Sequence, residues 1–176
     1  MAGGPRAVVD RFLAAANDHD VDATVACLSE RFECRGSDGL RLNREQMRVW
    51  LGWEIVMSHA YELSDVSELG ESLTAAMTEE SELYRLLRMQ PQRVRLRFEV
   101  SGDLIQVQEF EPIPSGPSLG EALAPFLDWV DRERPSALDG WRQGDEPMVN
   151  GESAARWLSL LREWSASLGP PPFSAG

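Results

Sequence analysis

Glu109 is the residue in this chain whose setting most resembles that of a buried acid or base. It lies on a predicted strand, on the same face as Ile105 and Val107. An ionised carboxylate next to apolar side chains is costly, and such surroundings raise its pKa. A carboxyl group with a pKa near neutrality can donate and accept protons at working pH. The pattern predicts that Glu109 points into the fold as an acid/base group, with Val107 as a ligand contact.

Two further carboxylates are candidates to act with Glu109. Glu79 ends the more apolar face of a predicted strand, where it follows Met77. Glu54 shares one face of a predicted helix with Trp50, at a spacing of i, i+4. A second carboxylate near Glu109 would raise its pKa further by like-charge repulsion. Glu79 is therefore predicted to be the second catalytic carboxylate, and Glu54, Trp50 and Met77 to be ligand contacts.

Each of these side chains also has an ordinary structural role open to it. Glu109 could be a surface carboxylate at an edge of the strand, or a carboxylate neutralised by an arginine. Glu79 could cap the helical turn that follows its strand. Tyr61 and Phe98 suit a hydrophobic core, and they become ligand contacts where that core is hollow. His59 is typical of a residue that pairs with the C-terminus of the preceding helix. The chain's two histidines have no metal-ligand spacing, so no metal is expected.

The elements that must position these residues follow from hydrophobic periodicity. The clearest is a hairpin over 92–111, where apolar and charged residues alternate on either side of a turn at Ser101-Gly102-Asp103. Apolar stripes at helical spacing predict helices before it, with Asp20 and Asn43 as N-terminal caps. The predicted order is helix 5–16, helix 21–28, strands 32–35 and 40–42, a helix from residue 44, strands 60–66 and 72–80, and a helical turn at 81–87.

Two more amphipathic helices are predicted after residue 112, over 118–134 and 152–168. Their apolar faces are broad and rich in Trp, so they must be buried against the sheet or a second subunit. We therefore expect one domain over 1–112, a helical extension over 113–169 packed on it, and a disordered tail over 170–176. The same apolar faces favour a homodimer.

Composition limits the classes of partner. The chain has 176 residues, of which 43% are hydrophobic and 26% charged, which is ordinary for a soluble domain. A net charge of −12 argues against nucleic acid and anionic membranes as partners. No signal peptide or membrane span is expected, because charged residues interrupt the first apolar run and no later run is long enough. Two cysteines are too few for a disulfide framework, so a cytoplasmic location is predicted.

The order of elements, together with VVDRFLAAANDHDVDATVACLSERF near the start and SGDLIQVQEFE at the hairpin, resembles the NTF2-like superfamily in its SnoaL-like branch. The resemblance covers about residues 5–112. It implies an α+β fold in which a curved, mainly antiparallel sheet forms a cone-shaped half-barrel, wrapped by three N-terminal helices around an apolar pocket. Members of the superfamily include ketosteroid isomerases, polyketide cyclases, limonene-epoxide-type hydrolases, dehydratases and pockets without catalysis.

The active-site patterns of these groups match the chain unevenly. Ketosteroid isomerases carry one Tyr and two Asp where this chain has Phe12, Gly36 and Leu96, so their mechanism is not expected. The closing-strand Asp of the epoxide hydrolases coincides with Glu109, but their Arg has become Glu80. SnoaL-like cyclases rely on one acid/base carboxylate in an apolar cavity, and Glu109 fits that role.

Two function classes remain open at this point. The first is a cofactor-independent enzyme of isomerase, cyclase or hydrolase type, which transfers protons on a hydrophobic small molecule. The second is a non-catalytic ligand-binding or dimerisation module, which the lack of a complete catalytic triad favours. In both, the expected ligand is a hydrophobic small molecule and no cofactor is expected.

Overall fold

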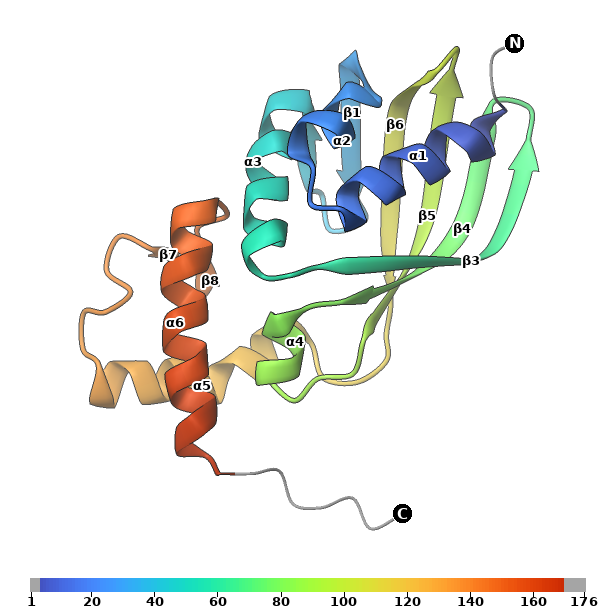
Figure 1. Cartoon of the computed structure of the whole chain (residues 1–176). Helices are drawn as coiled ribbons and strands as arrows, with labels where there is room; N and C mark the ends of the chain where they lie inside the picture. The colour runs from blue at the N-terminus through green and yellow to red at the C-terminus, as the bar shows by residue number, and fades with distance from the viewer. Residues whose placement is uncertain (1–3, 170–176) are drawn as a thin grey trace.

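A curved sheet of six strands organises the molecule (Figure 1). The computed structural model describes residues 4–169. The strands are β1 (Leu28–Gly36), β2 (Arg41–Asn43), β3 (Ala60–Leu69), β4 (Ser72–Glu80), β5 (Gln92–Ser101) and β6 (Leu104–Ile113). Their spatial order is β2-β1-β6-β5-β4-β3, and every neighbouring pair is antiparallel except β1 and β6. The predicted α+β fold with a curved, mainly antiparallel sheet is confirmed, and the sheet stays open rather than closing into a barrel.

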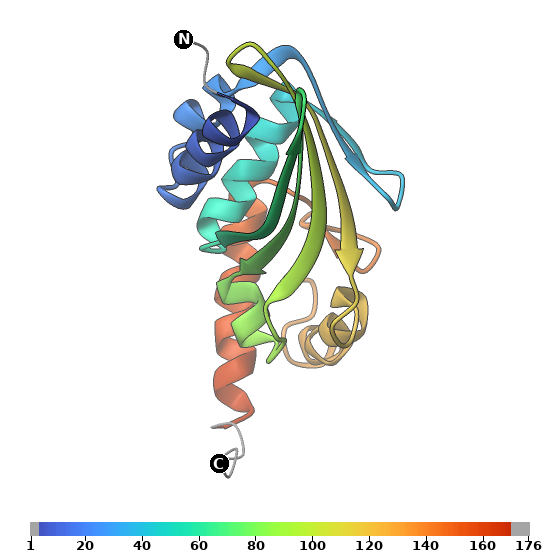
Figure 2. The same ribbon diagram turned by 90° about the vertical axis from the view of Figure 1, so that its right-hand side faces the viewer.

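Three N-terminal helices cover one face of this sheet (Figures 1 and 2). They are α1 (Pro5–Asn17), α2 (Val21–Ala26) and α3 (Arg44–Val56). The two predicted caps are present: the Asp20 side chain accepts a hydrogen bond from the Ala23 N–H, and Asn43 forms a capping box with Gln46. The apolar stripes of the helices meet the inner face of the sheet in one core. Its largest members include Phe12, Phe32, Met47, Leu51, Leu73, Leu96, Phe98 and Ile105.

A second core lies at the end of the sheet near the C-terminus of α3. It is built by α4 (Glu82–Leu86), α5 (Leu119–Glu133) and α6 (Gly151–Ser167), with a two-stranded ribbon, β7 (Arg142–Gln143) and β8 (Glu146–Pro147), between the last two helices. Its centre includes Phe126, Trp157, Leu161, Trp164 and, from α3, Trp53 and Met57. The broad apolar faces of α5 and α6 are therefore buried within the chain itself.

Two glycines set the approach of α6 to α3. A Cβ built at Gly151 would lie 3.4 Å from the carbonyl oxygen of Gly52. Because neither residue has a side chain, the first turn of α6 packs directly on the backbone of α3 (Figure 1). The division into a domain over 1–112 and an extension over 113–169 stays a prediction, and the predicted tail, 170–176, lies outside the described residues. Within 4–169, no helix is long and apolar enough to span a bilayer.

A β-bulge in β6 decides which of its side chains face inward. Val100 pairs with Ile105 but Glu99 pairs with Val107, which leaves Gln106 as an extra residue. A bulge shifts the alternation of inward and outward side chains by one position. Ile105 therefore points into the core, where it is fully buried, whereas Gln108 faces the inside in place of Val107. The prediction that Ile105, Val107 and Glu109 share one inward face is wrong.

Candidate active site

The inner face of the sheet and the helices over it enclose a cavity of about 360 Å³. Most of its wall is apolar and comes from both ends of the chain. The side chains that form this wall include Phe12, Leu13, Leu42, Met47, Leu51, Met77, Leu96, Phe98, Phe110, Leu123, Val149 and Trp157. Residues of α5, α6 and the β8 region thus complete a pocket that the sheet and the N-terminal helices begin.

Glu54 is the most perturbed acid in this cavity. It lies one turn after Trp50 on α3, and the Trp50 indole N–H donates to its Oε1 at 2.6 Å. Protein surrounds the carboxyl group, and the surface that it keeps borders the cavity. Burial raises its pKa from 4.5 to about 7, against the lowering effect of the nearby His59, while Glu79 raises it further. Glu54 is therefore poised to exchange a proton at neutral pH.

His59 and Glu79 form a second proton-carrying pair beside Glu54. His59 Nδ1 lies 2.6 Å from Glu79 Oε1 in an ion-pair contact, although the two groups do not complete a hydrogen bond. The Tyr84 hydroxyl donates to the same carboxylate oxygen at 3.3 Å. Burial disfavours a charged imidazole, but the carboxylates of Glu79 and Glu54 together outweigh burial and raise the pKa of His59. The other ring nitrogen, Nε2, is buried without a partner among residues 4–169.

Tyr61 adds a protonated hydroxyl to this group. It pairs directly with Glu79 across the β3–β4 ladder, so the two side chains lie on the same face. Burial, followed by the field of Glu54, raises the pKa of Tyr61 well above its usual value. Its hydroxyl lies near the Glu54 carboxylate but completes no hydrogen bond with a described residue. It is therefore a neutral hydroxyl that is buried beside the cavity without a partner among the described residues.

Most of the residues predicted from the sequence line this cavity. Trp50, Glu54, Tyr61, Met77, Glu79 and Phe98 all do so. Val107 and Glu109 do not, because the bulge at Gln106 turns both to the opposite face of the sheet. The cavity carboxyl group with a raised pKa is thus Glu54, which was predicted as a ligand contact, and not Glu109.

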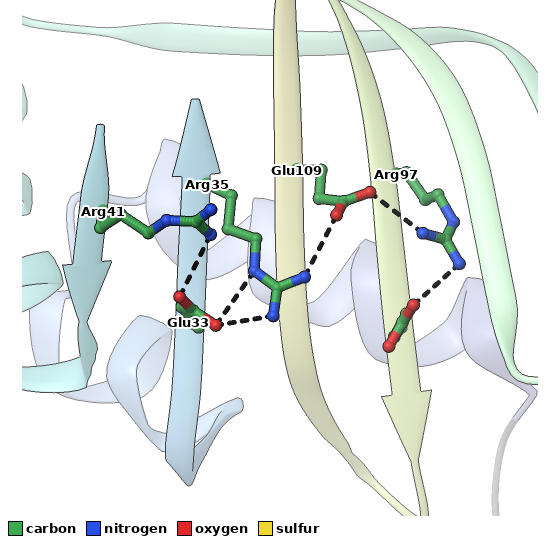
Figure 3. Close-up of polar contacts among 6 residues, drawn as sticks. Glu33, Arg35, Arg41, Arg97 and Glu109 are labelled. Carbon is green, nitrogen blue, oxygen red and sulfur yellow. Dashed lines mark hydrogen bonds and ion pairs between the residues drawn. The ribbon is translucent and has the colours of Figure 1, made fainter. Parts of the chain in front are cut away.

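Glu109 belongs to a ladder of ion pairs on the outer face of the sheet (Figure 3). Its two carboxylate oxygens lie 3.3 Å from Arg35 Nη1 and 3.0 Å from Arg97 Nη1. The side chain is 36% exposed, and the ladder continues through Arg35 to Glu33. An acid/base group needs access to the ligand, and Glu109 is separated from the cavity by the sheet itself. The prediction that it points into an apolar cavity is wrong.

Three members of the site carry no clear signal in the sequence. His59 occupies a position typical of a helix C-terminus, and Tyr84 lies in a short helical turn, so neither shows a pattern of its own. Strict alternation along the strand predicts Gln108 on the outer face. The pairing of Tyr61 with Glu79 was not readable either: regular pairing from the β3–β4 turn at Gly70 places Tyr61 opposite Glu80, and a register shift between Ser64 and Ser67 brings it opposite Glu79. Among the described residues, no group of three or more metal-ligating side chains is placed to hold an ion.

Comparisons with known proteins place the fold. No family model and no curated protein matches the sequence. Among solved structures, an NTF2-like protein of unknown function from Cytophaga hutchinsonii is 17% identical, with a TM-score of 0.53 over 65% of this chain and 94% of that one. A provisional ketosteroid isomerase from Kribbella flavida is 12% identical, with a TM-score of 0.55 over 65% of this chain and 81% of that one.

A third similar structure is an epoxide hydrolase/cyclase-like enzyme of pyran ring formation in the polyether salinomycin. It is 16% identical, with a TM-score of 0.54 over 62% of this chain and 90% of that one. Identities this low establish the fold and not the activity. The similarity to NTF2-like structures agrees with the resemblance found in the sequence. The chain has the NTF2-like fold.

Proposed function

We propose that the protein is a cofactor-independent enzyme that transfers protons on a small, mainly apolar molecule held in this cavity. The observation that carries the proposal is Glu54, a carboxyl group enclosed in an apolar cavity with a pKa raised to about 7. Burying such a group destabilises the fold, and an apolar residue at the same place would be more favourable. A carboxyl group retained there therefore points to a function. The provisional isomerase and the cyclase-like enzyme of the same fold support this class of chemistry.

The arrangement assigns a role to each polar side chain. Ionised Glu54 would accept a proton from the ligand, and protonated His59 would donate one from Nε2 while Glu79 stabilises its positive charge. The Tyr61 hydroxyl would donate a hydrogen bond to a ligand oxygen on which negative charge develops. One proton leaves the ligand and one enters it, so the charge of the whole site is unchanged by the reaction. An isomerisation, a cyclisation or an elimination all require this pair of transfers.

A sensitive test is proton exchange at carbon, since it can be followed on the ligand itself without identifying a product. The protein is incubated in D₂O with a panel of apolar ketones and lactones, and loss of the α-proton signal is followed by NMR. Glu54→Gln keeps the shape of the side chain and removes the base, so exchange should slow by about 10²–10⁴-fold. The matched control is Glu109→Gln, which removes a carboxylate on the far side of the sheet and should leave exchange unchanged.

The outcomes separate the two function classes. Equal exchange rates for the wild type and Glu54→Gln would refute Glu54 as the base. Ligands that bind to the wild type without any exchange or turnover would favour a non-catalytic binding pocket instead. Homodimer formation remains a separate proposal, because the Trp-rich faces expected to supply its interface are already buried within one chain.

A further inference from the structure

The side-chain amide of Gln108 has a buried oxygen that no described residue binds. Its side chain lines the cavity from β6, and its Oε1 atom is buried without a hydrogen-bond partner. Neighbouring polar side chains do not satisfy it: its partner across the parallel ladder is Cys34, and its antiparallel partner is Phe98. Leaving such a group unpaired in an apolar wall is unfavourable. A ligand that supplies the missing hydrogen bond would relieve that cost.

The register of the sheet places Gln108 apart from Glu79. Gln108 lies in register with Phe98 on β5, whereas Glu79 lies in register with Gln92, at the start of the same strand. The six residue steps from Gln92 to Phe98 correspond to about 20 Å of extended strand, which the curvature of the sheet shortens. Gln108 and Glu79 therefore lie at different levels of the cavity wall, with Met77, Leu96 and Phe98 among the apolar residues of that wall.

Gln108 and Glu54 border the same cavity. Cys34, the direct neighbour of Gln108, lines the cavity as Glu54 does. Burial raises the pKa of the Cys34 thiol to about 12, and the field of the Glu54 carboxylate contributes to that rise. Glu54 is therefore close enough to Cys34 for its charge to act there, and one ligand in the cavity can contact both Glu54 and Gln108.

We propose that Gln108 is a specificity-determining residue that binds a hydroxyl group of a mainly apolar ligand, which also contacts Glu54 in the same cavity. A hydroxyl matches an amide because it can both donate to Oε1 and accept from Nε2. The inference rests on the proposed use of the cavity as a ligand site, but it does not require that Glu54 be catalytic. A purely hydrocarbon end would leave the amide unpaired, and such a mismatch selects strongly against the wrong ligand.

The test uses a pair of rigid naphthyl ketones that differ at the far end only. These are 6-hydroxy-2-acetonaphthone and 2-acetonaphthone, with the 6-methoxy compound as a probe of size, and their affinities are measured by calorimetric titration of the whole chain. The wild type should bind the hydroxy ketone about tenfold more tightly than the deoxy ketone, because one hydrogen bond to a buried group increases affinity by about that factor. Gln108→Met, which keeps the length of the side chain, should reduce that ratio to about one.

The matched control is Gln106→Met, which changes the same residue type at the bulge, outside the cavity, and should keep the tenfold ratio. Thermal unfolding of Gln108→Met should show no loss of stability, because the variant removes an unpaired polar group. Equal binding of the two ketones to the wild type, or a ratio that persists in Gln108→Met, would overturn the assignment of Gln108 while leaving the pocket intact. Failure of all three ketones to bind would instead overturn the cavity as a ligand site, and the proposal with it.

Discussion

Replacing Glu54 by Gln should make the protein more stable at neutral and alkaline pH, and the size of the effect follows from the structure. In the unfolded chain the carboxyl group has a pKa near 4.5, and in the folded protein burial raises it to about 7. Between these two values the folded state keeps the proton that the unfolded state has lost. Stability therefore falls as the pH rises from about 4.5 to about 7, and the loss is complete above that range.

The magnitude is about 3 kcal/mol, since each unit of pKa corresponds to 1.36 kcal/mol. Glutamine has no proton to lose, so Glu54→Gln should be close to the wild type at pH 4 and up to about 3 kcal/mol more stable at pH 8. For a chain of this length that corresponds to about 6–12 °C in the midpoint of thermal unfolding. Urea unfolding curves of both proteins across pH 4–8 measure the difference directly.

The control for this experiment is Glu109→Gln, which removes an acceptor from two exposed arginine pairs. It should cost about 0–1 kcal/mol and show no gain at high pH. Parallel stability curves for the wild type and Glu54→Gln at every pH would refute the reasoning, because they would mean that Glu54 titrates alike in the folded and unfolded states.

The other predictions concern the second proton carrier, the second core and association. Glu79→Gln should lower the pKa of His59, since the carboxylate that favours its charged form is lost; NMR titration of the imidazole signals measures this, and an unchanged pKa would contradict the pairing. Trp157→Ala should destabilise the fold by about 3–5 kcal/mol in urea unfolding, because the indole is fully buried and lines the cavity; a loss below about 1 kcal/mol would mean that the second core tolerates a void there. The homodimer predicted from the sequence should sediment at twice the mass of the chain, and a single monomeric species at micromolar concentration would rule it out.

Local sequence was enough to determine the main helices, the strands of the six-stranded sheet and their order, but not the short β7–β8 ribbon. Helix caps, apolar stripes and alternation depend on residues a few positions apart, so Asp20, Asn43 and the turn at Ser101-Gly102-Asp103 could be recognised without tertiary information. The pairing of strands joined by short turns follows from the same local signals. The curvature of the sheet and the packing of three helices over it were expected from the resemblance to the NTF2-like superfamily.

Which carboxylate lies in the cavity was decided by tertiary structure alone. Strict alternation along β6 would turn Glu109 inward, but the single extra residue at Gln106 reverses the direction of every side chain after it. The residue types around Gln106 do not indicate a bulge, because the bulge arises from the pairing of β6 with β5 and β1. The raised pKa of Glu54 also depends on tertiary structure, because it comes from burial by residues distant in the sequence and from the field of Glu79. Sequence shows which side chains are able to carry a proton, and packing determines which of them are removed from water.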